Sequence, residues 1–200
     1  QDEGLVPDMA IEPGDETTRL FRERGWTHWH HLFNARQLIF LGFLRKQCLT
    51  QGSSAAMTLY FTKVTDWSNK GCHWHTGWEK PENLFYNQAF DTFWNYGTRS
   101  AYFLLAQWGL GTARFIDLSH IDGAIITAEA SQPSRAEMWI TDPPYADAVN
   151  YHEITEFFIA WLRKNPPKPF DEWVWDSRRA LAIKGAGEDF RRGMVAAYQA

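Results

Sequence analysis

The residues best suited to chemistry lie in the stretch ITDPPYADAVNY, residues 140–151. Two adjacent prolines, Pro143 and Pro144, form a stiff piece of backbone without N–H donors. An acid, Asp142, precedes them and a phenol, Tyr145, follows them, and the apolar run EMWIT lies just upstream. This pattern has two interpretations. It is either a tight exit from a strand or a rigid cradle for a flat polar group.

Asp-Pro-Pro-Tyr after an apolar strand-like run resembles the motif of amino-methyltransferases, which methylate exocyclic amines of bases. Such an amine is a poor nucleophile because its lone pair is delocalised into the ring. A carboxylate and a backbone carbonyl that accept hydrogen bonds from the NH₂ group hold it and favour a tetrahedral nitrogen. The resemblance assigns these roles to Asp142 and to the carbonyl of Pro143. It places Tyr145 against a base flipped out of the helix, with Pro144 also in contact with the substrate.

A wider resemblance rests on three segments, RGWTHWHHLFNARQL, NQAFDTFWNYGTR and TDPPYADAVNYHEITEFFIAWLRK. Together they are similar to the large adenine-specific DNA methylases of bacteria and archaea that carry a zinc-ribbon insertion, several of which accompany anti-phage systems. The similarity covers most of residues 22–192 and is strongest at 139–164. It implies a Rossmann-like α/β methyltransferase fold, S-adenosylmethionine as cofactor and N6 of adenine in DNA as substrate. It also implies a role in restriction–modification or anti-phage defence, with other defence-system proteins as partners.

The chain departs from this family in its glycine-rich segments. A methyltransferase holds its cofactor in a loop of the form Asp-x-Phe-x-Gly-x-Gly at a strand end. Residues 109–115 (GLGTARF) and 184–190 (KGAGEDF) contain glycines, but neither follows a convincing apolar strand. In the family this loop and the zinc ribbon lie upstream of the matched part.

We therefore expect the main cofactor cradle to lie in the remainder of the same polypeptide. The first residue, Gln1, and the helix-like final residues indicate a fragment of a longer protein. We expect the chain alone to bind S-adenosylmethionine poorly or not at all. Within it, the strand end TAEA (127–130) resembles the place where such folds contact the cofactor's adenine, which makes Ala128 and Glu129 the cofactor-binding candidates.

The elements that must position these residues follow from apolar periodicity. It predicts helices over 34–49, with Asn34 as N-cap, over 53–67, where a strand is the alternative, and over 83–109. Short buried strands are predicted over 122–130 and 136–142. Residues 1–25 are expected to be an irregular lead-in. Residues 26–200 are expected to be part of one domain, with a helical segment (26–110) and a segment containing the sheet and the motif (111–200).

Residues 149–164 have the pattern of an amphipathic helix that ends on basic residues and is closed by Pro166 and Pro167. One stripe is apolar: Ile154, Phe157, Phe158, Trp161 and Leu162. The charged and polar residues lie off it: His152, Glu153, Glu156, Arg163 and Lys164. A strand, a Pro-Pro turn and a helix would place Asp142 beyond the carboxyl end of a strand, where open α/β sheets bind ligands.

Two further groups of polar residues have open interpretations. Asn87 and Asn95, on the predicted helix 83–109, either face the base or the DNA, or are exposed or bonded between helices. Basic residues after the motif either contact phosphates or form a solvated face; they are Arg163, Lys164, Lys168, Arg178, Arg179, Lys184, Arg191 and Arg192.

The composition is that of a globular chain, with 44% apolar and 22% charged residues. A net charge of −4 means that no global basic field points to nucleic acid, although a local patch would suffice. The 11 tryptophans indicate a bulky core and also offer stacking surfaces. There is no signal peptide and no run of 18 apolar residues, so neither secretion nor membrane spanning is expected. Two cysteines suit a reducing cytoplasm.

Two other kinds of site have less support. Six potential metal-binding side chains, His28, His30, His31, Cys72, His73 and His75, fall in the segments THWHH (27–31) and CHWH (72–75). Neither segment has the spacing of a known zinc site, and no metal is expected. Nothing local to Cys48 or Cys72 would depress a thiol pKa, which argues against a Cys–His nucleophile.

Three alternatives to adenine methylation remain open. Enzymes that methylate N4 of cytosine more often carry Ser in place of Asp142, and those that act on RNA or on protein glutamine usually carry Asn there. A non-catalytic DNA-binding or assembly module, with the motif as a structural turn, is the alternative from another class. The missing glycine-rich loop supports it.

Overall fold

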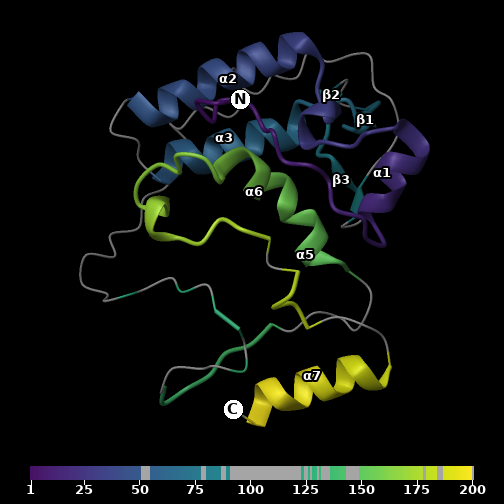
Figure 1. Ribbon diagram of the computed structural model, residues 1–200, viewed down its shortest axis with the longest axis vertical. Coiled ribbons are helices and arrows are strands. Elements are labelled where there is room, and N and C mark those ends of the chain that lie inside the picture. Colours follow the sequence, from purple (N-terminus) through teal and green to yellow (C-terminus); the bar gives the residue numbers. More distant parts are fainter. Residues whose placement is uncertain are drawn as a thin grey trace.

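A computed structural model describes residues 1–50, 55–77, 80–86, 89–90, 123, 126, 128–129, 131, 136–142, 149–177, 179–183 and 187–199. The α-helices in these ranges are α1 (Thr17–Arg24), α2 (Ala35–Thr50), α3 (Ala55–Trp67), α5 (Tyr151–Ile154), α6 (Glu156–Leu162) and α7 (Glu188–Gln199) (Figure 1). Two 3₁₀ helices are η1 (Trp29–Leu32) and η3 (Phe170–Glu172). The strands are β1 (Trp74–His75), β2 (Lys80–Pro81), β3 (Phe85–Tyr86) and β4 (Ala89–Phe90).

The prediction of a Rossmann-like α/β fold is wrong for the part of the chain that the structure describes. Strands pair there in two antiparallel couples, β1 with β2 and β3 with β4. Each strand has two residues, whereas a doubly wound fold needs a parallel sheet of long buried strands. The described architecture is mainly helical.

The predicted strand over 136–142 is also wrong. These residues belong to no helix or strand, and all are exposed. The exposed fractions of Met138, Trp139 and Ile140 are 76%, 56% and 90%. The described positions of the other predicted strand, 123, 126, 128 and 129, are likewise outside any element. An apolar run becomes a strand only when a neighbouring strand takes its backbone N–H and C=O groups, and none of the described strands does so here.

The helices predicted over 34–49 and 53–67 are confirmed as α2 and α3. Asn34 caps α2 as expected, because its Oδ1 accepts the N–H of Gln37 at 2.9 Å. The Gln37 side chain returns the interaction by accepting the N–H of Asn34 at 2.8 Å, which completes a capping box. α2 is less buried than its sequence indicates, since Ile39 and Phe43 are exposed.

Two other predictions need correction. The helix expected over 83–109 is wrong at its start, where Phe85–Tyr86 and Ala89–Phe90 form β3 and β4; most of its remainder lies outside the described residues. The irregular lead-in contains α1 and contributes Met9 and Leu20 to the core. The N-terminal residues are therefore an integral part of the folded body.

Aromatic side chains build the centre of the core, and α6 supplies two of them. The Phe157 ring lies 6.0 Å from the rings of both Trp29 and Phe33, measured between centroids. The Trp161 ring lies 5.2 Å from Phe33 and 5.4 Å from Phe61 of α3. α6 accordingly runs beside α3, with α2 on the other side of α3 (Figure 1). These aromatic side chains form the bulky core that the number of tryptophans predicts.

α7 lies apart from this core, at the C-terminal end of the chain (Figure 1). None of its residues is buried. Among the described helices, α7 included, none has both the length and the apolar character needed to cross a membrane.

Candidate functional site

The structure describes one residue of the Asp-Pro-Pro-Tyr motif. Asp142 is exposed, so its carboxylate is open to a partner. Pro143, Pro144 and Tyr145 lie outside the described residues, as do Asn87 and Asn95. The site is therefore built from Asp142 and from the two flanks of the motif, residues 136–142 upstream and α5–α6 downstream.

The downstream flank confirms the predicted amphipathic helix. α5 and α6 are separated by Thr155 alone, which keeps helical dihedral angles (φ −64°, ψ −23°). The apolar stripe packs inward: Ile154, Phe157, Trp161 and Leu162 are buried, and Phe158 is half-buried. The helix pair that follows the motif in sequence is thus part of the aromatic core.

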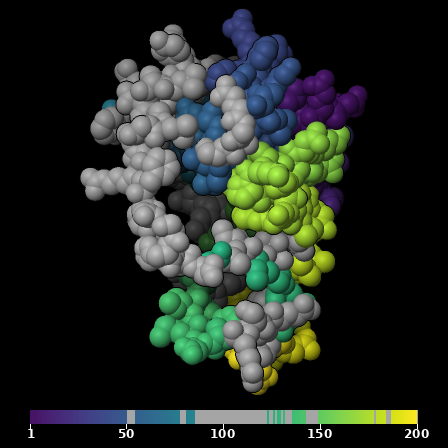
Figure 2. All heavy atoms as spheres, turned by 90° about the vertical axis from the view of Figure 1, so that its left-hand side faces the viewer, coloured from purple at the N-terminus to yellow at the C-terminus, as the bar shows by residue number. Residues whose placement is uncertain are grey.

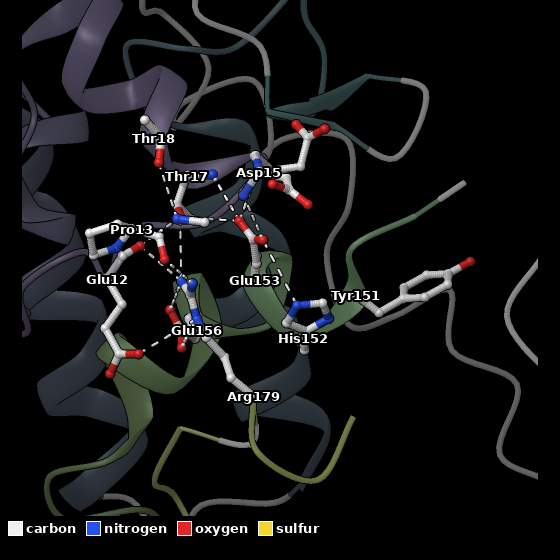
Figure 3. Close-up of polar contacts among 12 residues, drawn as sticks. Glu12, Pro13, Asp15, Thr17, Thr18, Tyr151, His152, Glu153, Glu156 and Arg179 are labelled. Carbon is white, nitrogen blue, oxygen red and sulfur yellow. Dashed lines mark hydrogen bonds and ion pairs between the residues drawn. The ribbon is translucent and has the colours of Figure 1, made fainter. Parts of the chain in front are cut away.

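Glu153 and Glu156, which the sequence places off the apolar stripe of this helix, are buried. Their exposed fractions are 3% and 0%. On a helical wheel both residues lie away from the apolar stripe, so periodicity predicts solvent for them. They are buried because residues distant in sequence cover that face of the helix and bind both carboxylates: residues 12–17, Ser177 and Arg179 (Figure 3).

Glu153 caps the N-terminus of α1 from a distance. Its Oε1 accepts the N–H of Asp15 at 2.9 Å, and its Oε2 accepts the N–H groups of Glu16 and Thr17 at 3.0 and 2.9 Å. The hydroxyl of Thr17 donates to the same oxygen at 3.1 Å. These N–H groups have no acceptor inside the helix, and the N-cap residue, Glu16, makes no side-chain cap bond. A negative charge here also suits the helix dipole.

The residues around Glu153 leave room for its carboxylate and stabilise the charged form. A Cβ atom on Gly14 would lie 2.4 Å from its carboxylate atoms, so the contact requires glycine at this position. Burial raises the pKa of Glu153, but the hydrogen bonds from Thr17, Asp15 and Glu16 outweigh burial and leave this pKa below its ordinary value. His152 is the nearest ionisable ring, with Nε2 3.8 Å from Oε1.

Glu156 binds Arg179 in a two-pronged ion pair. Nε of Arg179 donates to Oε1 and Nη2 donates to Oε2, both at 2.7 Å, and the Ser177 hydroxyl adds a bond of 2.7 Å. The same guanidinium donates to the carbonyl oxygens of Pro13 at 2.7 Å and Glu12 at 3.0 Å. Burial lowers the pKa of Arg179, and the bonds and charge of Glu156 more than reverse that effect.

We call this arrangement the carboxylate clamp: Glu153, Glu156 and Arg179 with residues 12–17. One weak signal for it exists in the sequence, since α1 begins without the Ser, Thr, Asp or Asn that usually caps a helix. Nothing in the sequence says that residue 153 supplies the missing cap.

The candidate cofactor residues, Ala128 and Glu129, are both exposed. Glu129 lines a cavity of about 230 Å³ that Ala128 and Asp142 do not reach; the other lining residues are Ser131, Ala180, Leu181, Ala182, Ile183, Asp189, Gly193, Ala196 and Ala197. Pockets that enclose organic ligands usually measure ~300–1,000 Å³. This cavity therefore does not fit a whole S-adenosylmethionine molecule.

The histidine cluster is a compact local structure. The centroid of His28 lies 5.4 Å from those of His30 and His31, and the latter two rings are 4.5 Å apart. Thr27 contacts Nδ1 of His28 and of His31. Burial and the neighbouring rings lower the pKa values of His30 and His31. In the part of the chain described, no group of three or more His, Cys, Asp or Glu side chains is arranged to hold a metal.

The remaining candidates are also accounted for where they are described. Cys48 and Cys72 are buried, and burial raises the pKa of Cys48. Most of the basic residues proposed for phosphate contact are in ion pairs: Arg163 and Lys164 with Asp8, Arg179 with Glu156, Arg191 with Glu188 and Arg192 with Asp189. Pairing of this kind leaves less positive charge for a nucleic-acid backbone.

Comparison with known proteins assigns no family: no family model matches the chain, and neither a curated protein nor a solved structure is significantly similar to it. The function is therefore argued from the residues of the site.

Proposed function

We propose that this chain forms the base-binding part of an enzyme that methylates N6 of adenine in DNA, with S-adenosylmethionine as the methyl donor. The observation that carries the proposal is the motif at Asp142: an exposed carboxylate is followed in the sequence by two prolines and a tyrosine, and a helix pair anchored in the core begins at Tyr151. The resemblance of the motif and its flanking segments to amino-methyltransferases points to the same enzyme class.

The proposed chemistry is one of positioning. The carboxylate of Asp142 and the carbonyl of Pro143 accept hydrogen bonds from the two N–H groups of the target amine, which orients the nitrogen lone pair toward the methyl donor. Tyr145 stacks on the flipped base and offsets the stacking lost from the duplex. The fixed backbone angles of Pro143 and Pro144 limit the movement of these groups.

The partners follow from this assignment. The chain acts on duplex DNA, and the remainder of the same polypeptide supplies the glycine-rich cofactor loop. A role beside other proteins of an anti-phage system, in a reducing cytoplasm, belongs to the same proposal. Cytosine N4 is the rival acceptor, and nucleoside analysis of methylated duplexes distinguishes it from adenine N6.

A non-catalytic DNA-binding or assembly module is the second candidate. It is favoured by one observation: the strands in the described residues form no parallel sheet, and the cavity beside Glu129 is too small for the donor. In such a module the motif would serve only as a structural turn.

Substitution of Asp142 in the intact polypeptide separates the two candidates. For the methyltransferase, Asp142→Ala should lower the methylation rate by at least ~100-fold, comparable to the loss of one oxyanion-hole donor, while DNA affinity changes less than about threefold. Asp171→Ala, an exposed acid in η3, is the matched control. Full methylation by Asp142→Ala would exclude the proposed role of the motif.

The 200-residue chain alone provides a second test. Because its described cavity is too small for the donor, calorimetric titration with S-adenosylmethionine should show no binding at micromolar concentrations. A micromolar Kd would contradict the proposal that the cradle lies in the remainder of the polypeptide.

A further inference from the structure

Residues 27–31 (THWHH) gather three imidazole rings on one short segment. The ring centroids of His28, His30 and His31 lie 4.5 to 5.4 Å from one another. All three residues are half-buried, and the tryptophan among them, Trp29, is completely buried. Histidine is the side chain whose ordinary charge change falls between pH 5 and pH 8. The protonation state of this cluster therefore bears directly on the segment that carries it.

A backbone donor holds the His31 ring in its neutral form. The N–H of Thr27 donates to Nδ1 of His31 over 3.2 Å, so this nitrogen presents its lone pair and the proton of the neutral ring lies on Nε2. Protonation of Nδ1 would set an N–H group against another N–H group. The bond from Thr27 and the charged form of His31 therefore exclude each other.

The His30 ring has the same preference for a different reason. It makes a hydrogen bond to the backbone of Pro7, and because proline has no N–H, the ring is the donor and the carbonyl oxygen accepts. The Nδ1 atom of His30 is buried and has no hydrogen-bond partner in the described part of the chain. Nε2 is therefore the donor, and a second proton on Nδ1 would be buried without an acceptor, which is costly.

The charges around the two rings reinforce this preference. Burial and the charge of His28 lower the pKa of His30 by more than its backbone hydrogen bond and Asp8 raise it. Burial, followed by the charges of His30, His28 and Lys70, lowers the pKa of His31. Both rings are thus kept neutral by their surroundings.

The segment that carries the rings fastens the N-terminal residues to the core. Residues 27–29 lie antiparallel to residues 9–11, with a bridge between Ala10 and His28. Two backbone hydrogen bonds join the stretches: from the N–H of Trp29 to the carbonyl of Met9 at 3.1 Å, and from the N–H of Ile11 to the carbonyl of Thr27 at 2.9 Å. The residues that pair with the N-terminal stretch therefore include one that donates to His31 and one that carries a ring of the cluster.

We propose that residues 27–31 are an acid-sensitive switch: protonation of His30 and His31 at mildly acidic pH loosens the pairing of residues 27–29 with residues 9–11. Because both folded-state pKa values lie below the ordinary value of 6.5, the pairing is fully stable above about pH 6.5 and weakens as the pH falls toward the lower folded values. The switch does not depend on the proposed function.

Hydrogen exchange of the intact polypeptide tests the switch, measured by mass spectrometry and corrected for the intrinsic effect of pH. Between pH 7.5 and pH 5 the protection of the Ile11 and Trp29 amides should fall by about tenfold or more, the order expected when a backbone donor loses its acceptor. Protection in α3 should fall by less than about twofold, because local opening leaves distant elements closed.

Two substitutions remove the titration and keep the hydrogen bonds of the neutral rings. His31→Asn keeps an acceptor, its Oδ1, for the N–H of Thr27, and His30→Gln keeps a donor for the carbonyl of Pro7. In the double variant the protection of the same two amides should be equal at both pH values, and each single variant should lose part of the pH dependence. His75→Asn, in β1 and outside the cluster, is the matched control and should open with acid as the wild type does.

Three results would overturn the proposal. The first is a wild-type protein whose Ile11 and Trp29 amides keep their protection down to pH 5. The second is an equal loss of protection in α3, which would mean that acid unfolds the whole body. The third is a double variant that opens like the wild type, which would assign the sensitivity to another group such as Asp66, whose pKa burial raises to about 6. If circular dichroism shows that the double variant is unfolded at pH 7.5, the two single variants decide by the same criterion.

Discussion

The two flanks of the motif have similar apolar content and opposite structural roles. Upstream, Met138, Trp139 and Ile140 are 56% or more exposed. Downstream, Phe157 and Trp161 are at most 1% exposed and lie at the centre of the aromatic core. Figure 2 shows the green atoms of residues 136–142 on the surface, away from the blue and purple N-terminal elements.

The difference shows what an apolar pattern specifies. A helix satisfies its backbone hydrogen bonds internally, so an amphipathic stripe needs only a surface to pack against. A strand needs a partner for its backbone as well. Residues 149–164 find a surface to pack against among the described residues. Residues 136–142 find no strand partner there. Asp142 is the last described residue of the exposed flank.

Matched tryptophan substitutions should produce the largest contrast between the flanks. Trp161→Ala removes a ring that contacts Phe33 and Phe61 and should lower the free energy of unfolding by about 3–5 kcal/mol. Trp139→Ala should change it by less than about 0.5 kcal/mol. Urea denaturation followed by circular dichroism measures both. Similar losses for the two variants would mean that residues 136–142 belong to the core.

This contrast also marks the limit of prediction from sequence. The helices α2, α3 and α5–α6 were predictable, because their periodicity, the Asn34 cap and the closing prolines are local signals. The arrangement of the strands could not be predicted, because a strand forms only where a second, distant segment offers its backbone for pairing. The burial of Glu153 and Glu156 was equally hidden, since it depends on N–H groups and a guanidinium supplied by residues far away in the chain.

The Glu156–Arg179 pair provides the next largest effect on the anchored flank. Arg179→Met leaves a fully buried carboxylate without its main partner and should cost about 3–4 kcal/mol in unfolding free energy. Adding Glu156→Leu should recover most of that loss, because a buried ion pair can often be replaced by apolar residues of similar size. Thermal denaturation of the two variants measures the difference.

A surface pair provides the control for this prediction. Arg191→Met in α7 removes an exposed ion pair with Glu188 and should leave the melting temperature unchanged. If the double variant at 156 and 179 were no more stable than Arg179→Met alone, loss of the hydrogen bonds to Glu12 and Pro13 would be the dominant effect.

The pH dependence of stability should distinguish Glu153, on the buried flank, from Asp142, the acid of the motif. Glu153→Gln should cost about 1.5–3 kcal/mol at pH 7, the range for hydrogen bonds to a charged group. The folded-state pKa of Glu153 is lowered, so this stabilisation is present above the ordinary value of 4.5 and is lost as the pH falls through the lower folded value. The positive charge of Arg179 also favours the charged form of Glu153, and so does His152 when it is protonated.

Asp142→Asn, on the exposed side, is the matched comparison. Its unfolding free energy should equal that of the wild type at each pH between 7 and 3, measured by denaturant titration. If the difference between Glu153→Gln and the wild type stayed constant as the pH fell to 3, the hydrogen bonds to the ionised carboxylate would not be the source of its stabilisation.

The smallest predicted effect compares the two ways in which helices begin in this protein. α2 is capped by its neighbour Asn34, a signal readable in the sequence, whereas α1 is capped by Glu153 from across the fold. Asn34→Ala should cost about 1 kcal/mol, the usual loss for an N-cap, and should leave the pH dependence of stability unchanged because Asn34 carries no charge. Since Asn34 does not contact the carboxylate clamp, its effect should add to that of Glu153→Gln in the double variant. A local cap and a distant one would then be separable: the first stabilises one helix, and the second also couples that helix to the segment after the motif.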